Sequence, residues 1–296
     1  MPAWDSGGSS KPIREALGVL SVGDIRNALM ALAQGEGRRG GVVRVFNTRL
    51  SDTEDRAALT RELSSYVDRL GEPTVGYLRR FVEAAGPGFD LRRGSLGNFV
   101  LAGVWLSHGK DINAAISVFR ELCSIRGHAW PASTANDLQL HATLTDGATL
   151  EGQHRITTLE GAGIRDIRLV PAASANPRVL ETVAAADAIV FGPGSFYTSV
   201  LPHTLVEGIP AAIAARSGIP KILVGNLREC PETVGVTLNR MFGELSQRVG
   251  LTHFLVPQRS DIGFDEYGAD LRGVRVMRRD VEDSAVAATL AQLARG

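Results

Sequence analysis

The stretch that decides the fold class is Asp187-Ala-Ile-Val-Phe-Gly-Pro-Gly-Ser-Phe-Tyr-Thr-Ser-Val-Leu-Pro202. Residues 188–191 form a short apolar run, which is typical of a strand buried on both faces. The run ends in a Gly-Pro-Gly-Ser turn, and hydroxyl side chains and an expected helix follow. Open α/β sheets bind ligands at the carboxyl ends of their strands, where helix N-termini favour phosphate. By itself, such a turn fits an ordinary strand–helix connection equally well.

The residues around this stretch alternate between strand and helix patterns. Expected strands are 167–170, 188–191, 221–224, 252–256 and 274–277, and expected helices are 177–185, 206–216, 233–249 and 281–294. Such alternation predicts an α/β fold with a doubly wound, mostly parallel sheet.

The first half of the chain has a different pattern. Helical spacing of apolar residues dominates a section at about 54–125, and a further helix begins near Ser21. Residues 42–46 resemble a short strand. Alternation on both sides of Asp146-Gly147 predicts an added β-hairpin over 138–156, either on the main sheet or as a small lobe. Because no repeat or linker is visible, we expect residues 1–296 to form a single domain.

Composition excludes several classes of protein. The 296 residues contain 32 Lys plus Arg and 32 Asp plus Glu, so no basic excess indicates nucleic acid as a partner. No apolar run is long enough for membrane insertion, and no secretory hydrophobic region is visible. Cys123 and Cys230 are far apart and fit core positions. A cytoplasmic protein is the default expectation, and exposed sheet edges make a homodimer plausible.

Two segments near the N-terminus carry candidate site residues. Asp5 and the loop Gly7-Gly8-Ser9-Ser10 could hold a nucleotide or a divalent ion, or simply form a flexible chain end. Asp24, Arg26 and Asn27 lie at the start of the helix near Ser21. Asp24 could be a helix cap, and Arg26 suits a phosphate or carboxylate ligand.

Two asparagines complete the candidates. Asn98, in Gly94-Ser-Leu-Gly-Asn98, could face a ligand or make an internal hydrogen bond beside a capping Ser95. Asn226 follows an expected strand and could contact a base or sugar, or fix its own turn. The sequence contains no HExxH motif, no Gly-x-Ser-x-Gly elbow around Ser195 and no GxxxxGK[ST] loop, which disfavours a zinc site, a hydrolase triad and a P-loop.

Taken in order, these motifs resemble the gluconeogenesis factor family, relatives of the 2-phospho-L-lactate transferases of deazaflavin cofactor synthesis. The matching segments, which cover nearly the whole chain, are Asp5-Ser-Gly-Gly-Ser-Ser10, Leu17-Gly-Val-Leu, Gly23-Asp-Ile-Arg-Asn27, Gly94-Ser-Leu-Gly-Asn98, Arg126-Gly127, Asp187 through Pro202, and Val224-Gly-Asn-Leu227. The ordered set is more specific than any single member.

The resemblance implies a Rossmann-like fold that binds a nucleoside-diphosphate ligand. The transferase branch moves a phospholactyl-type group from a guanosine diphosphate donor to a deazaflavin acceptor, with Mg²⁺. The factor branch binds UDP-sugars and influences carbon metabolism and cell shape. Because Gly23–Asn27 resembles the second branch, we favour a nucleotide-sugar-binding regulator of carbon metabolism or cell-envelope homeostasis. The transferase is the alternative.

The resemblance also assigns roles to residues. Asp5 and Asp24 become the candidate catalytic and metal-binding carboxylates. We expect the ligand-binding residues to converge with them on one cleft; these are Gly7, Gly8, Ser9, Arg26, Asn27, Asn98, Gly192, Gly194, Ser195, Thr198 and Asn226. Family members usually begin with a strand and a glycine-rich phosphate loop before the segment at Asp5. We therefore expect the natural product to be longer than this chain.

Overall fold

The computed structural model describes residues 2, 4, 10–37, 40–67, 69–159, 163–268, 271–279 and 283–294. The chain divides into two compact units, Met1–Asp137 and Leu138–Gly296, and each is described by itself. That residues 1–296 form a single domain stays a prediction. Within the described ranges, no helix has the length and apolar character needed to cross a membrane.

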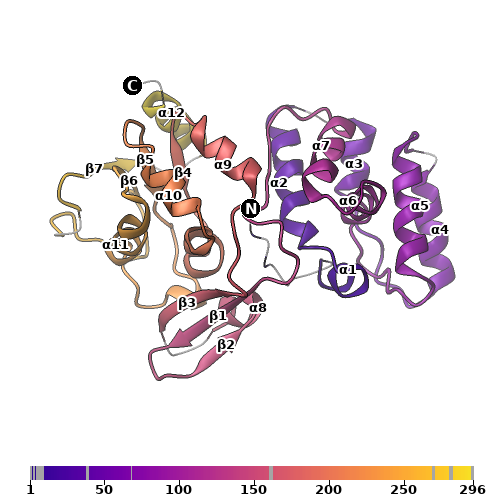
Figure 1. Cartoon of the computed structure of the whole chain (residues 1–296), viewed down its shortest axis with the longest axis horizontal. Coiled ribbons are helices and arrows are strands. Elements are labelled where there is room, and N and C mark those ends of the chain that lie inside the picture. The colour runs from indigo at the N-terminus through magenta and orange to yellow at the C-terminus, as the bar shows by residue number, and fades with distance from the viewer. Residues whose placement is uncertain are drawn as a thin grey trace. The chain divides into compact units, whose positions relative to one another are not determined.

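Unit 1, as far as the structure describes it, is built from helices (Figure 1). They are α1 Ser10–Leu17, α2 Val22–Gly35, α3 Gly41–Phe46, α4 Arg56–Val67, α5 Thr74–Ala85, α6 Leu96–Ser107 and α7 Ile112–Leu122. Helix α6 is the centre of the unit because its residues 96–105 are all buried. Gly103 permits the contact with α5, since a Cβ there would overlap the carbonyl oxygen of Tyr77. The predicted helical section is therefore the core of this unit.

The strand expected at 42–46 is wrong, because these residues form helix α3. Val43, Val45 and Phe46 are buried, and the Phe46 ring stacks on Phe119 with a centroid distance of 4.7 Å. A short run rich in valine fits a strand or a buried helix equally well by pattern. Here the packing against neighbouring helices outweighs the β propensity of valine.

Unit 2 contains the expected parallel sheet. Its strands are β4 Ile189–Phe191, β5 Lys221–Val224, β6 His253–Pro257 and β7 Arg275–Arg279, in the order β4-β5-β6-β7. Its longer helices are α9 Pro177–Ala184, α10 Ile209–Ala214, α11 Leu238–Val249 and α12 Asp283–Leu293. Leu290 of α12 packs against Ile222 on one face of the sheet, and Phe242 of α11 stacks on Phe254 at 4.9 Å. The α/β fold class with a mostly parallel sheet is confirmed (Figure 1).

The hairpin belongs to a separate antiparallel sheet. Strand β1 Gln139–Leu144 pairs with β2 Thr149–Glu151 on one side and with β3 Ile164–Val170 on the other. Asp146 supports the predicted turn by accepting a hydrogen bond from Ala148 N at 2.9 Å. The second arm ends at Gly152 (φ 90°), after which α8 Gln153–Thr157 begins.

The expected place of residues 167–170 in the parallel sheet is wrong. They belong to β3, which is antiparallel to β1. The strand contains Arg165, Asp166 and Arg168, and exposed and buried positions are mixed along it. A central parallel strand is usually apolar on both faces, whereas an antiparallel strand can keep one face in water. The polar residues of β3 therefore fit the smaller sheet.

Candidate functional site

The Gly-Pro-Gly-Ser turn lies at the carboxyl end of β4, as predicted. Gly192 adopts a positive φ of 70°, and a Cβ there would lie 3.0 Å from the carbonyl oxygen of Val224. After Ser195 the chain continues as the π-helical turn η1 Phe196–Val200 and the 3₁₀ turn η2 Leu201–Leu205. Glycine is needed at 192 both for its backbone conformation and for the close approach of β5.

Asn226 holds this turn in place. Its Oδ1 accepts a hydrogen bond from Gly194 N at 3.3 Å, and its Nδ2 donates to Gly194 O at 2.9 Å. The Ser260 hydroxyl donates to the carbonyl oxygen of Asn226 at 2.9 Å. Asn226 thus links the loops that follow β4, β5 and β6. Because both ends of its side-chain amide are engaged by Gly194, its predicted contact with a base or sugar stays a prediction.

A buried carboxylate, which sequence reasoning missed, caps the start of η1. Glu232 is only 2% exposed, and its Oε1 accepts a hydrogen bond from Tyr197 N at 3.0 Å. The amide and hydroxyl of Thr198 also face this carboxylate, whose Oε2 is buried without a hydrogen-bond partner among the described residues. Burial raises the pKa of Glu232, although the polar groups of Thr198 and Tyr197 act in the opposite direction. The protein's own side chain therefore occupies the position that an anion takes at a helix N-terminus.

The remaining predicted residues of this region differ in accessibility. Thr198 is fully buried, and its hydroxyl lies 3.5 Å from that of Thr157. Gly192, Gly194 and Ser195 are half-buried, and the Ser195 side chain makes no capping hydrogen bond to η1. Ser195 is therefore better placed than Thr198 to offer a hydroxyl to a ligand.

Unit 1 brings two predicted residues into contact. Arg26 of α2 is 6% exposed, and its Nε donates to Asn98 Oδ1 of α6 at 3.1 Å. Gly97 permits this approach, since a Cβ there would lie 3.1 Å from Cγ and Cδ of Arg26 and 2.6 Å from Phe46 O. Asn98 is 1% exposed and makes an internal hydrogen bond, which is one of the two roles predicted for it.

The charge of Arg26 is not balanced by a described carboxylate. Across the ranges that the structure describes, no Asp or Glu forms an ion pair with its guanidinium. Burial, and to a smaller extent the nearby positive charge of Arg49, lower the pKa of Arg26 to about 10. Arg26 still carries its charge at neutral pH. A buried cation without a counter-charge is costly, which makes this position the strongest candidate anion site in the unit.

Three other side chains lie on the same two helices. Asp24 is half-buried in the first turn of α2, where Ser21 occupies the N-cap position. Asn27 is exposed on α2 and does not share the burial of Arg26. Ser95 occupies the N-cap position of α6 but makes no capping hydrogen bond, and its buried Oγ has no partner among the described residues. An unsatisfied buried hydroxyl near Asn98 adds a second polar group that a ligand could satisfy.

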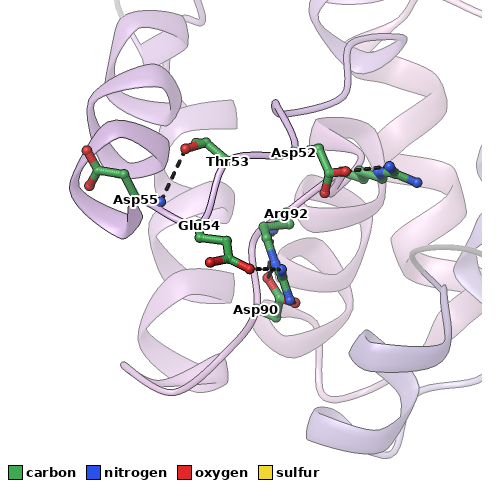
Figure 2. A network of polar contacts seen from close by, with 7 residues as sticks. Asp52, Thr53, Glu54, Asp55, Asp90 and Arg92 are labelled. Atoms are coloured by element: carbon green, nitrogen blue, oxygen red, sulfur yellow. Dashed lines mark hydrogen bonds and ion pairs between the residues drawn. The ribbon is translucent and has the colours of Figure 1, made fainter.

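Arg92 and Arg93 of unit 1, in contrast, are paired with carboxylates of the protein itself. Figure 2 shows Asp90 and Glu54 beside Arg92, whose Nη2 and Nη1 lie 2.9 Å and 3.6 Å from these carboxylates. Asp52 pairs with Arg93, and the side chain of Asp55 caps the first turn of α4. Arg26 differs from Arg92 and Arg93 in being buried and in having no carboxylate partner among the described residues.

The other candidate site residues stay predictions. Asp5, Gly7, Gly8 and Ser9 lie outside the described residues. No group of three His, Cys, Asp or Glu side chains suited to a metal occurs in the described part of the chain. A Mg²⁺ site at Asp5 and Asp24 therefore stays a prediction. Arg26 and Asn98 belong to unit 1, whereas the Gly-Pro-Gly-Ser turn belongs to unit 2, so convergence on one cleft also stays a prediction.

Comparisons with known proteins identify the family. Residues 2–290 match the family model of the 2-phospho-L-lactate transferase CofD. A putative gluconeogenesis factor of Nostoc is 34% identical over 79% of this chain and 42% of its own length. The gluconeogenesis factor of Bacillus subtilis is 30% identical over 83% of this chain and 65% of its own length. The chain thus spans about two-fifths to two-thirds of the length of these relatives.

A solved structure agrees with this result. A member of the UPF0052 family from Bacillus halodurans superposes with a TM-score of 0.72 at 26% identity, covering 100% of this chain and 89% of the other. The family resemblance inferred from the motifs is confirmed. The chain belongs to the CofD family, together with relatives named gluconeogenesis factor.

Proposed function

We propose that this protein binds a UDP-sugar-like nucleotide and acts as a regulator of carbon metabolism or of cell-envelope homeostasis. The observation that carries the proposal is the buried guanidinium of Arg26 beside Asn98, for which the described part of the chain offers no carboxylate partner. The printed names of the relatives from Nostoc and Bacillus subtilis, gluconeogenesis factor, support a role in carbon metabolism.

The chemistry of Arg26 suits a diphosphate. Its Nε donates a hydrogen bond to Asn98, which fixes the plane of the guanidinium. No described residue accepts a hydrogen bond from its two terminal nitrogens, so a ligand can use them. Planar pairs of N–H donors match phosphate oxygens, and such charge-assisted hydrogen bonds are stronger than neutral ones. A bound diphosphate would also supply the negative charge that the described residues do not provide.

The alternative is a transferase that moves a phospholactyl-type group from a guanosine diphosphate donor to a deazaflavin. The matching family model, named for such a transferase, favours it. Asp24 is the described carboxylate that could serve as a general base or hold Mg²⁺. A cytoplasmic location and a homodimer remain predictions for either function.

Titration calorimetry with UDP-glucose and GDP tests the binding. We expect UDP-glucose to bind and Arg26→Met to weaken it at least about tenfold, the effect of losing one charge-assisted contact. The matched control is Arg61→Met, which removes the same charge from a guanidinium that is 71% exposed on α4. Failure of the unmodified protein to bind UDP-glucose, or equal weakening by both variants, contradicts the proposal.

A second assay separates the two functions. The protein is incubated with a guanosine diphosphate donor carrying a phospholactyl group, a deazaflavin and Mg²⁺, and the products are followed by chromatography. Transfer of the group to the deazaflavin would establish the alternative and reject the regulator. Binding of UDP-glucose without transfer supports the regulator.

A further inference from the structure

A second group of positive side chains lies in unit 2, around a cavity of about 410 Å³. The cavity is lined by Pro220, His253, Arg275, Met277, Arg279, Thr289, Gln292 and Leu293. These residues come from the amino ends of β5 and β6, from β7, and from the last turns of α12. The Gly-Pro-Gly-Ser turn follows the carboxyl end of β4, so the cavity is a separate place on the sheet.

The alternation along β7 directs its side chains into this cavity. Arg275, Met277 and Arg279 share one face of the strand, and all three line the cavity. His253 lies opposite Arg275 in the register of β6 and β7, which places two basic side chains together at one end. Arg279 lies four residues further along, at roughly 13 Å for an extended strand. The cavity therefore has a basic group at each end and the apolar Met277 between them.

Among the described residues, these basic groups have no partner of opposite charge. Within the described ranges neither Arg275 nor Arg279 forms an ion pair, and the side-chain hydrogen bond of Arg279 goes to the carbonyl oxygen of Arg278 at 2.9 Å. Burial lowers the pKa of His253, and the charge of Arg275 lowers it further. The cavity thus has a positive potential that the described carboxylates do not cancel.

Arg278, on the opposite face of the same strand, provides the contrast. Its Nη2 lies 3.2 Å from Glu266 Oε2, and its guanidinium lies 5.2 Å from the centre of the Phe264 ring. This arginine is satisfied by its neighbours. Arg275 and Arg279, which line the cavity and are exposed, have no such carboxylate partner among the described residues and are available to a ligand.

We propose that this cavity binds an elongated small molecule with a phosphate at each end, such as a sugar bisphosphate. One phosphate contacts Arg275 and His253, and the other contacts Arg279. Met277 and Leu293 contact the carbon skeleton, while Thr289 and Gln292 offer hydrogen bonds to its hydroxyl groups. The volume lies within the usual range for small-molecule sites.

The competing explanation is protection of the sheet edge. Strand β7 is an edge strand, and charged residues on such strands prevent pairing with another chain. This explanation predicts aggregation when the arginines are removed and no selectivity among phosphate compounds.

Calorimetry with fructose 1,6-bisphosphate, glucose 6-phosphate and inorganic phosphate at constant ionic strength tests the proposal. We expect the bisphosphate to bind at least about tenfold more tightly than either monophosphate. Arg275→Gln and Arg279→Gln should each weaken it about tenfold or more. Arg278→Gln, which changes the net charge equally, should leave it unchanged, as should Arg26→Met in unit 1.

The titration of His253, followed by NMR, reports on the site directly. A phosphate bound beside His253 should raise its pKa, and this shift should disappear in Arg275→Gln. The proposal is overturned if the bisphosphate does not bind, if inorganic phosphate binds equally well, or if the three arginine variants bind alike. Unchanged binding with increased aggregation would establish edge protection instead.

Discussion

Around the Gly-Pro-Gly-Ser turn of unit 2, donors that a phosphate could use are engaged by the protein's own side chains, whereas no described carboxylate balances the positive charge of Arg26 in unit 1. Glu232 accepts a hydrogen bond from Tyr197 N and faces the polar groups of Thr198, and Asn226 engages both polar groups of Gly194. Arg26 has one described hydrogen bond, to Asn98, and no described carboxylate partner.

The comparison distinguishes two roles that polar residues play at the candidate site. In unit 2 the polar groups mainly fix the turn, so removing them should reduce stability. In unit 1 the cation is buried without a described counter-charge and so should cost stability, which means that removing it should reduce ligand binding and not stability. Substitutions at Glu232 and Asn226 test the structural role, and a substitution at Arg26 tests the ligand-binding role.

The largest effect is expected for Glu232→Ala. The change leaves the Tyr197 amide and the Thr198 donors without their buried acceptor, which should lower the free energy of unfolding by about 3 kcal/mol. Urea denaturation followed by circular dichroism measures the loss. Glu232→Gln keeps an acceptor oxygen and should lose less than half as much. Equal losses in both variants would show that the hydrogen bonds are not the reason for burying this residue.

Asn226→Ala should have the next largest effect. It removes two neutral hydrogen bonds to Gly194, each with a net value of about 1 kcal/mol, so we expect a loss of about 2 kcal/mol. Asn27→Ala on the exposed face of α2 is the control and should change stability by less than about 0.5 kcal/mol. If Asn226→Ala keeps full stability but abolishes UDP-glucose binding, its role is ligand contact and the contrast fails.

Arg26→Met should change stability in the opposite direction. Methionine fills a similar volume without a charge to desolvate, so the ligand-free variant should be more stable by about 1 kcal/mol. The same denaturation experiment measures this gain, with Arg61→Met as the control expected within about 0.5 kcal/mol of the unmodified protein. A loss of 2 kcal/mol or more would mean that Arg26 is a structural residue whose charge is balanced within the protein.

The parts of the fold that were predictable carry a strong local pattern. The strands at 188–191 and 221–224 are short apolar runs bounded by glycine, and the helical section has clear apolar spacing. The run at 42–46 was ambiguous because only its buried contacts with Phe119 and α6 decide between helix and strand. Strand β3 was misplaced because its partner depends on β1, which local pattern does not reveal.

The candidate site was predictable only where residue chemistry is distinctive. A phosphate role was assigned to Arg26 because a guanidinium beside a helix start suits an anion. Glu232 was missed because nothing in Cys230-Pro-Glu-Thr233 distinguishes a buried cap from an ordinary exposed acid. Only its hydrogen bond from Tyr197 N in η1, 35 residues earlier in the sequence, identifies Glu232 as a buried cap.

The smallest expected effect is the pH dependence of the contribution that Glu232 makes to the free energy of unfolding. Burial raises the pKa of Glu232 above its ordinary value of 4.5, so the folded protein holds this proton more tightly than the unfolded chain does. The corresponding stabilisation is complete below pH 4.5 and is lost as the pH rises through the raised pKa, at no more than about 1.4 kcal/mol per pH unit. Because glutamine does not titrate, the difference in unfolding free energy between the unmodified protein and Glu232→Gln should decline over this interval and then become constant. A difference that instead grows with pH would mean that the polar groups of Tyr197 and Thr198 dominate and hold the carboxylate ionised.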